Sequence, residues 1–263
     1  MQFGARAGQA ALEALVQDGC LKARFPRQQD TPGKTGVLIN TAGGIADGDI
    51  LDIAVRVGCG ADVVMTSQAA ERVYKARNMA VPSRLHTVLG VEKAATLYWL
   101  PQETILFDGG AIARRYDADI AQGGRCLMAE MLVFGRVARG EVIEKTSLFD
   151  RWRIRLDGRL VFADGFRLSG GAPHTYGTAR LKGVKAIATL LFIGPEAAFA
   201  KARLRDSMED AGCHAACSER GGVLIARFAG AEPHTVREAM MAAIALLDEG
   251  KDMASPVLSR WIF

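Results

Sequence analysis

No run of apolar residues in this sequence approaches the roughly 18–20 residues that a membrane-spanning helix needs. The most apolar stretch, Ala186 to Ile193, has only the length of a β-strand. Residues 1–8 contain no apolar segment and no cleavage signature, so a secretory signal is not expected. These absences argue against a protein with transmembrane helices.

The sequence also lacks a strong charge imbalance and a disulfide pattern. The 33 Lys and Arg residues against 29 Asp and Glu residues leave a formal net charge of +4, too small to argue for a nucleic-acid partner. The five cysteines are an odd number at scattered spacings. Together with the missing secretory signal, this spacing predicts reduced thiols in a cytoplasmic protein.

Glycine is abundant, and it marks the turns of a β-rich chain. The 29 glycines are about 11% of the 263 residues, against a usual value of roughly 7%. Between about residues 20 and 166, apolar and polar side chains alternate, for example over 51–57 and 152–156. This is the pattern of half-buried strands. Asp157-Gly158 has the composition of a two-residue type I′ hairpin turn, and the whole pattern predicts a mainly β fold.

Two helices are predicted in the C-terminal part. Residues 196–212 follow Pro195, and residues 235–249 follow Pro233 and end before a glycine. Each segment places apolar side chains on one stripe. Apolar strands are predicted over 181–193 and 223–228. Since no repeat or linker interrupts the chain, we predict a single domain over residues 1–263.

Two segments look like nucleotide-binding loops but lack the required residues. Gly33-Lys34-Thr35 resembles the end of a P-loop, yet the position that needs the first glycine is Gln28, and a strand pattern follows. The glycine-rich residues 40–49 do not have the spacing G-x-G-x-x-G and also precede a strand. We interpret 40–49 as a connection between two antiparallel strands.

One cluster has the composition of a metal site. Cys213-His214-Ala-Ala-Cys217 offers thiolates and an imidazole, which suit zinc, nickel or copper. A closed site usually needs four ligands, and the next candidate, His234, is far along the chain. Packing at the end of a helix is therefore the favoured interpretation. Cys59, flanked by glycines, is interpreted as a hairpin tip, and no catalytic constellation is found.

Four arginines follow one another in a strand pattern and its turn. Arg151, Arg153, Arg155 and Arg159 could form a phosphate site, but a solvated strand face is the favoured interpretation.

Several long segments between residues 20 and 168 occur in a characteristic order. They are LKARFP (21–26), LINTAGGIADGD (38–49), TSQAAERVYK (66–75), WLPQETILFDG (99–109), EMLVFGR (130–136) and DRW (150–152) running into GRLVFAD (158–164). In this order they resemble the urease accessory proteins of the UreD (also called UreH) type. The resemblance is weak beyond residue 168. Residues 1–19 match no family motif, and within them residues 9–16 fit either a short helix or a strand.

The resemblance implies a cytoplasmic maturation chaperone rather than an enzyme. Its family fold is a β-helix-like assembly of stacked sheets with many strands and few helices. Proteins of this family bind the urease apoprotein and two further accessory proteins, a helical adaptor and a GTPase. The complex helps to insert nickel into the urease active site. No permanently bound cofactor is expected, since nickel would only be in transit.

Nickel transit gives a possible role to carboxylates within the matching segments. Oxygen ligands and water hold Ni²⁺ weakly enough to pass it on, whereas a thiolate cage would retain it. The candidates for a polar, water-filled path are Asp49, Glu71, Glu103, Asp108, Glu130 and Asp150. An exposed apolar face on the C-terminal helices, including the end from Ser255 onward, is expected to dock an accessory partner.

Two other functions remain open at this point. One is a metal-dependent enzyme built around Cys213, His214 and Cys217. The other is a free-standing β-rich module that binds a small ligand or a sugar. Tightly bound metal with turnover in the absence of partners would favour the former, and a soluble monomer that binds such a ligand would favour the latter.

Overall fold

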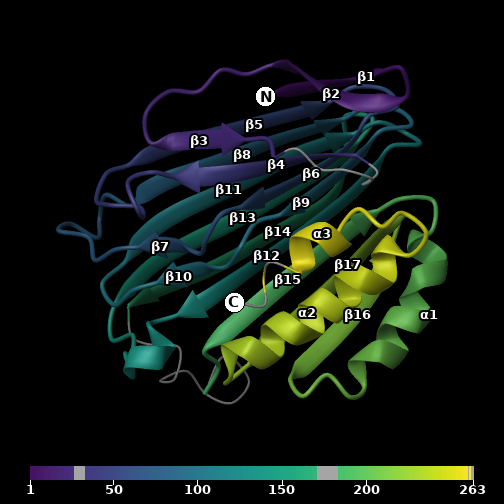
Figure 1. Cartoon of the computed structure of the whole chain (residues 1–263). Helices are drawn as coiled ribbons and strands as arrows, with labels where there is room; N and C mark the ends of the chain where they lie inside the picture. Colours follow the sequence, from purple (N-terminus) through teal and green to yellow (C-terminus); the bar gives the residue numbers. More distant parts are fainter. Residues whose placement is uncertain (27–32, 171–182, 260, 262–263) are drawn as a thin grey trace.

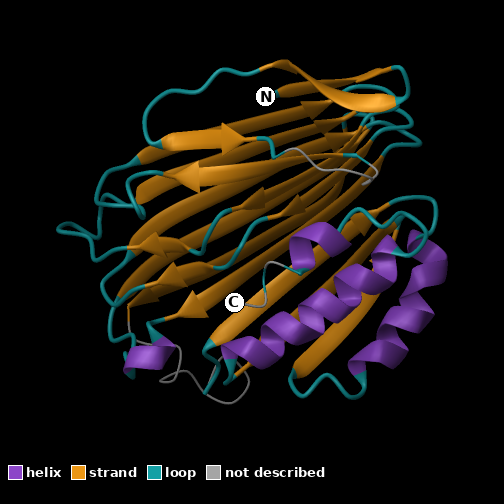
Figure 2. Cartoon of the chain, in the orientation of Figure 1, coloured by secondary structure: helices purple, strands orange, loops and turns teal. Residues whose placement is uncertain are grey.

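A computed structural model describes residues 1–26, 33–170, 183–259 and 261. Within these residues the chain forms a seven-stranded and a ten-stranded sheet, with helices gathered over one part of the strands (Figures 1 and 2). The mainly β fold predicted from the alternating pattern is thereby confirmed. No helix in the described part of the chain is long and apolar enough to cross a membrane.

The order of the strands in each sheet differs from their order along the chain. From one edge to the other, the seven-stranded sheet contains β14 (Arg159–Gly170), β13 (Thr146–Leu156), β11 (Ala111–Ile120), β8 (Ser83–Val91), β5 (Ile50–Val57), β1 (Gln2–Arg6) and β2 (Gln9–Ala14). The main path of the ten-stranded sheet contains β16 (His214–Arg220), β17 (Val223–Gly230), β15 (Ala186–Ile193), β12 (Arg125–Phe134), β9 (Thr96–Leu100), β6 (Asp62–Ser67), β4 (Lys34–Asn40) and β3 (Leu21–Arg24). Beside this path lie β10 (Thr104–Leu106) and β7 (Glu71–Val73).

The central strands are wound in a β-helix-like manner. Along the chain, β4, β5, β6, β8, β9, β11, β12 and β13 belong alternately to the ten-stranded and the seven-stranded sheet. Neighbours within each sheet are parallel, as β5, β8, β11 and β13 are in one and β4, β6, β9 and β12 in the other. This winding confirms the β-helix-like fold implied by the family resemblance.

The winding corrects two turn assignments. Residues 40–49 connect β4 to β5, which lie in different sheets, so they do not join antiparallel neighbours. Cys59 likewise lies between β5 and β6, at a crossing between the sheets and not at a hairpin tip. Alternation identifies strands but not their partners. In the first connection a Cβ on Gly44 would lie 2.7 Å from the Arg72 carbonyl oxygen, so only glycine fits there.

The hairpin predicted at Asp157-Gly158 is confirmed. β13 and β14 pair antiparallel, and the two turn residues have φ angles of 49° and 73°. A type I′ turn requires positive φ at both central positions. The undecided residues 9–16 contain strand β2, which pairs with β1.

Both predicted helices are present, and they cover the outer face of the ten-stranded sheet. α1 (Ala197–Met208) packs on β16 and β17, while α2 (Pro233–Asp248) packs on β12, β15 and β17. The short α3 (Ser255–Leu258) and the 3-10 helix η1 (Val137–Arg139) were not predicted. The predicted strands appear as β15 and β17, although residues 181 and 182 lie outside the described part.

The central strands β9 and β12 of the ten-stranded sheet are buried on both faces. All ten residues of β12 are buried, because Cys126 and Met128 face the seven-stranded sheet while Leu127 and Ala129 face the helices. Strands covered on both sides become continuously apolar. A polar side chain on the inward positions of β12 is therefore exceptional, and Glu130 is such a side chain.

Candidate functional site

A group of polar side chains lies in the space between the two sheets. On β11 the inward positions run Ile112, Arg114, Tyr116 and Ala118, so a guanidinium occupies a place where the neighbours are apolar or aromatic. Arg114 is only 1% exposed. A buried charge is costly unless it is paired and hydrogen-bonded. The contacts of Arg114 therefore decide how this interior is held together.

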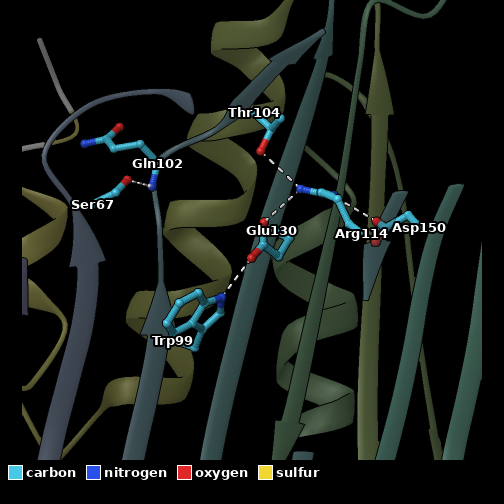
Figure 3. Close-up of polar contacts among 7 residues, drawn as sticks. All are labelled: Ser67, Trp99, Gln102, Thr104, Arg114, Glu130 and Asp150. Carbon is cyan, nitrogen blue, oxygen red and sulfur yellow. Dashed lines mark hydrogen bonds and ion pairs between the residues drawn. The ribbon is translucent and has the colours of Figure 1, made fainter. Parts of the chain in front are cut away.

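Arg114 joins carboxylates from both sheets (Figure 3). Its Nη2 lies 2.7 Å from Asp150 Oδ2 on the neighbouring strand β13, and its Nη1 lies 3.3 Å from Glu130 Oε2 on β12. Nη1 also donates to Thr104 Oγ1 at 3.1 Å, and Trp99 Nε1 donates to Glu130 Oε1 at 2.8 Å. We call these five side chains the polar cluster: Trp99, Thr104, Arg114, Glu130 and Asp150.

Burial strongly affects the protonation equilibria of the cluster. It raises the pKa of Glu130 above its ordinary value, although the nearby guanidinium and the Trp99 hydrogen bond act in the opposite direction. Burial alone would lower the pKa of Arg114, but Asp150 and Glu130 more than compensate and raise it. Arg114 is thus permanently charged, and it balances one of the two carboxylates.

The cluster adjoins two cavities and, beyond them, an outer hollow. A cavity of about 270 Å³ is lined by Asn40, Glu71, Gln102, Tyr116 and Glu130, among others. A cavity of about 30 Å³, roughly the share of one water molecule in the liquid, is lined by Arg114, Glu130, Asp150 and Asp164, among others. Asp164 and Thr189 also line an outer hollow of about 360 Å³ with His214 and Arg227. Glu130 therefore lies where the two cavities meet.

Two atoms of the cluster are left without a hydrogen-bond partner in the described part of the chain. They are Asp150 Oδ1 and Arg114 Nε, and both are buried. Buried polar atoms are normally satisfied by protein or by water. Since both residues line the smaller cavity, that space suits a water molecule or another small polar species.

Glu71 lines the wider cavity but makes no hydrogen bond to the polar cluster among the described residues. Its carboxylate accepts hydrogen bonds from Asn40 Nδ2 at 3.1 and 3.2 Å. Burial raises the pKa of Glu71, and the hydrogen bond from Asn40 opposes that shift. Near the same cavity, the Gln102 N–H donates to Ser67 Oγ at 2.9 Å, which holds the loop between β9 and β10 (Figure 3). Glu71, Glu130 and Asp150 are thus the predicted carboxylates that the structure brings to the two cavities.

The other three candidates have local partners. Glu103 forms an ion pair with Arg237 of α2. Asp49 Oδ2 accepts a hydrogen bond from the Ala46 N–H at 2.8 Å. Asp108 Oδ1 accepts from the backbone N–H groups of residues 144 and 145 at 2.7 and 2.9 Å. Asp49 and Asp108 therefore stabilise turns, and Glu103 holds α2 against the sheet through its ion pair. That any of the six candidate carboxylates contributes to a nickel path remains a prediction.

The Cys213/His214/Cys217 segment does not form a compact ligand set. It begins strand β16 and does not end a helix, which corrects the expectation from the sequence. Four residues of extended chain separate the two sulfur-bearing positions by roughly 13 Å, too far to share one ion. Cys217 Sγ lies 3.7 Å from the Lys201 carbonyl oxygen. Within the described ranges, no group of three or more His, Cys, Asp or Glu side chains is placed to hold a metal ion.

Sequence reasoning missed Arg114, Trp99 and Tyr116. The alternation on β11 carried a usable signal, because Arg114 shares parity with Ile112 and Ile120. An arginine in an apolar row predicts a buried cation that needs carboxylate partners. Which carboxylates these are depends on the pairing of strands that are distant in sequence.

Fold and site together define a β-helix-like scaffold with a polar interior lined by carboxylates, hydroxyl groups and the buried guanidinium of Arg114. Comparison with known proteins shows the family to which the chain belongs. The chain belongs to the UreD urease accessory protein family, whose family model matches residues 1–260. Its role therefore lies in the maturation of urease.

Individual relatives support this assignment over nearly the whole chain. Urease accessory protein UreD 2 of Methylorubrum populi is 40% identical over 252 residues, covering 92% of this chain and 84% of the relative. UreD of Rhodopseudomonas palustris is 40% identical, with coverages of 88% and 81%. UreD of Rhizobium etli is 38% identical, with coverages of 97% and 90%.

Proposed function

We propose that this protein is a non-catalytic chaperone that binds the urease apoprotein and assists the insertion of nickel into its active site. It acts together with a helical adaptor and a GTPase in the cytoplasm. Membership of the UreD family supports the role in urease maturation. The polar interior is the observation that supports passage of nickel through this chain.

Ni²⁺ in transit would meet oxygen donors along the cavities. Glu71 lines the wider cavity, Glu130 lies between the two, and Asp150 lines the smaller one. Oxygen ligands hold such an ion less tightly than thiolates. A cation at Glu130 must also compete with the guanidinium of Arg114, 3.3 Å away. This competition keeps binding weak, as a conducting path requires.

The helical layer offers a surface for the adaptor. On α1, Phe199 is 82% exposed although it is a large aromatic side chain. By contrast, Val257, Leu258 and Trp261 of the C-terminal end are buried in the core with the helices. Deleting the chain from Ser255 onward would therefore damage the fold and not only remove a docking surface. Substitution of Phe199 is the cleaner test of docking.

The nickel path is tested by isosteric removal of its charges. Glu130→Gln and Asp150→Asn keep the side-chain shape, and Asp52→Asn on the outer face of the same scaffold serves as the matched control, since its side chain is 75% exposed. Each variant is combined with urease apoprotein, the adaptor, the GTPase, GTP and Ni²⁺. Nickel per urease active site, urease activity and complex formation are measured.

We expect Glu130→Gln and Asp150→Asn to reduce nickel incorporation and activity while the complex still forms. Asp52→Asn should behave like the wild type. Unfolding curves show whether each variant is folded under the assay conditions. Normal nickel incorporation by both interior variants would overturn the path through this cluster, and turnover of a substrate by the chain alone would overturn the non-catalytic role.

A further inference from the structure

The outer face of the seven-stranded sheet carries a strip of arginines on its last two strands. The strand register places Phe149 opposite Arg167 and Arg155 opposite Leu160. Arg151 and Arg153 lie between these pairs at alternate positions of β13 and share their face. We call this strip the arginine face: Phe149, Arg151, Arg153, Arg155, Leu160 and Arg167.

The register also corrects the sequence-based grouping of the arginines. Arg159 pairs with Leu156, whose parity is that of the buried Trp152 and Ile154. Its position therefore belongs to the opposite side of the hairpin. Arg167 of β14, which the sequence-based grouping did not include, lies opposite Phe149 and belongs to the face instead of Arg159. The four arginines of the face thus come from both strands of the hairpin.

None of these four guanidinium groups has an ion-pair partner among the residues that the structure describes. The nearest carboxylates in register, on β11, are already engaged. Asp117 accepts from Arg115 and lies 2.9 Å from His86 Nε2. Asp119 accepts from the Gly158 N–H at 3.0 Å. The partly or fully exposed cations of the arginine face therefore have no carboxylate of the described residues as a partner, and Arg151 Nε is buried without a hydrogen-bond partner.

Exposed apolar side chains lie among these cations. Phe149 is 42% exposed and Leu160 49% exposed. Ala163 and Gly165 occupy the outward positions of β14 between Leu160 and Arg167, so only small side chains lie there between the larger ones. Helices α1 and α2 make their main contacts with the ten-stranded sheet, on the other side of the molecule. Neither helix covers the arginine face.

We propose that the arginine face is a docking surface for an acidic patch on a protein partner. Arginine pairs with carboxylates through two parallel hydrogen bonds. Protein interfaces are also enriched in arginine and aromatic residues. A nucleic acid or an anionic membrane fits less well, because Asp117 and Asp119 border the strip and no lysine lies on it. That the partner belongs to the urease maturation complex rests on the proposed function.

Reversal of charge on the strip tests this proposal. The double variant Arg153→Glu/Arg155→Glu is compared with Arg6→Glu/Arg220→Glu, which makes the same change of charge at exposed arginines of β1 and β16. Phe149→Ala tests the apolar contribution with the charge unchanged. Each full-length variant is assayed for co-purification with urease apoprotein, the adaptor and the GTPase separately, and for binding to poly-L-glutamate, at about 0.05 M and about 0.5 M NaCl.

We expect the strip variant to lose about tenfold or more of its affinity for one protein partner and for poly-L-glutamate at low salt, because like charges would then face each other. High salt should weaken wild-type binding, Phe149→Ala should weaken it partly, and the control pair should bind normally. Equal partner binding by strip and control variants would overturn the proposal. Each variant is also tested for binding to duplex DNA and to phosphatidylserine vesicles. Loss of binding to either of these while protein binding persists would overturn the proposal as well. Wild-type failure to activate urease would instead count against the proposed function, and poly-L-glutamate would still report on the face.

Discussion

Arg114 and Asp150 lie directly opposite each other on the parallel strands β11 and β13, and Arg114 Nη2 is 2.7 Å from Asp150 Oδ2. Both side chains point into the space between the sheets, where they are 1% and 9% exposed. The same guanidinium reaches Glu130 on the other sheet. This ion pair within one sheet therefore also links the two sheets of the scaffold.

Removal of the shared cation should destabilise the fold strongly. Arg114→Met leaves two buried carboxylates without their counterion, and breaking a buried pair costs about 3–5 kcal/mol. Arg115→Met, the neighbouring residue on the exposed side of the same strand, removes only a surface pair with Asp117, for which about 0–1 kcal/mol is expected. Urea unfolding of both variants measures the difference. Equal free energies of unfolding would show that the buried pair is not important for stability.

Glu71 and Glu141 should affect stability with opposite dependence on pH. Burial raises the pKa of Glu71, whereas the hydrogen bond from Arg136 lowers the pKa of Glu141. The contribution of Glu71 is present below its ordinary pKa of about 4.3 and is lost as pH rises through the raised value. The contribution of Glu141 is present above that ordinary pKa and is lost as pH falls through the lowered value.

Glu71→Gln should therefore gain stability relative to the wild type as pH rises above the ordinary pKa of a glutamate, about 4.3. Glu141→Gln should lose stability relative to the wild type as pH rises from about 3 to about 6. Urea unfolding at several pH values gives both differences. Parallel curves for the two variants would contradict the assigned environments.

The two cysteines of the β16 region should be dispensable for metal transfer. The extended chain keeps their thiols apart, so the double variant Cys213→Ala/Cys217→Ala removes no shared ligand set. Nickel incorporation into urease should stay within about twofold of the wild type, since oxygen donors are proposed to carry the ion. The readout is nickel per urease active site by elemental analysis. A loss of incorporation without unfolding would reassign the path to this strand.

Phe199 and Leu204 separate docking from folding on a single helix. Phe199 is 82% exposed and Leu204 is fully buried. Phe199→Ala should change the free energy of unfolding by no more than about 0.5 kcal/mol but weaken binding of the helical adaptor. Leu204→Ala should cost about 2–5 kcal/mol. Adaptor binding unaffected by Phe199→Ala would exclude this side chain from the interface.

The sequence predicted the elements better than their arrangement. Alternation and turn chemistry located the β13–β14 hairpin, and proline and glycine located α1 and α2, because these signals are local. Pairing between the sheets is not local, and so the sequence pattern assigns residues 40–49 to a wrong connection. The same limit applies to the site. Glu130 and Asp150 are two of the six candidate carboxylates, but only the register of β11 and β13 and the packing of β12 against β11 reveal Arg114 as their common partner.

We propose that this chain helps nickel to enter urease. The most direct measurement is nickel per urease active site, with urease activity, after incubation of the apoprotein with Ni²⁺, GTP, the adaptor and the GTPase, with and without this protein. We expect nickel incorporation and activity to rise when the chain is added. Equal incorporation in its presence and absence would contradict the claim.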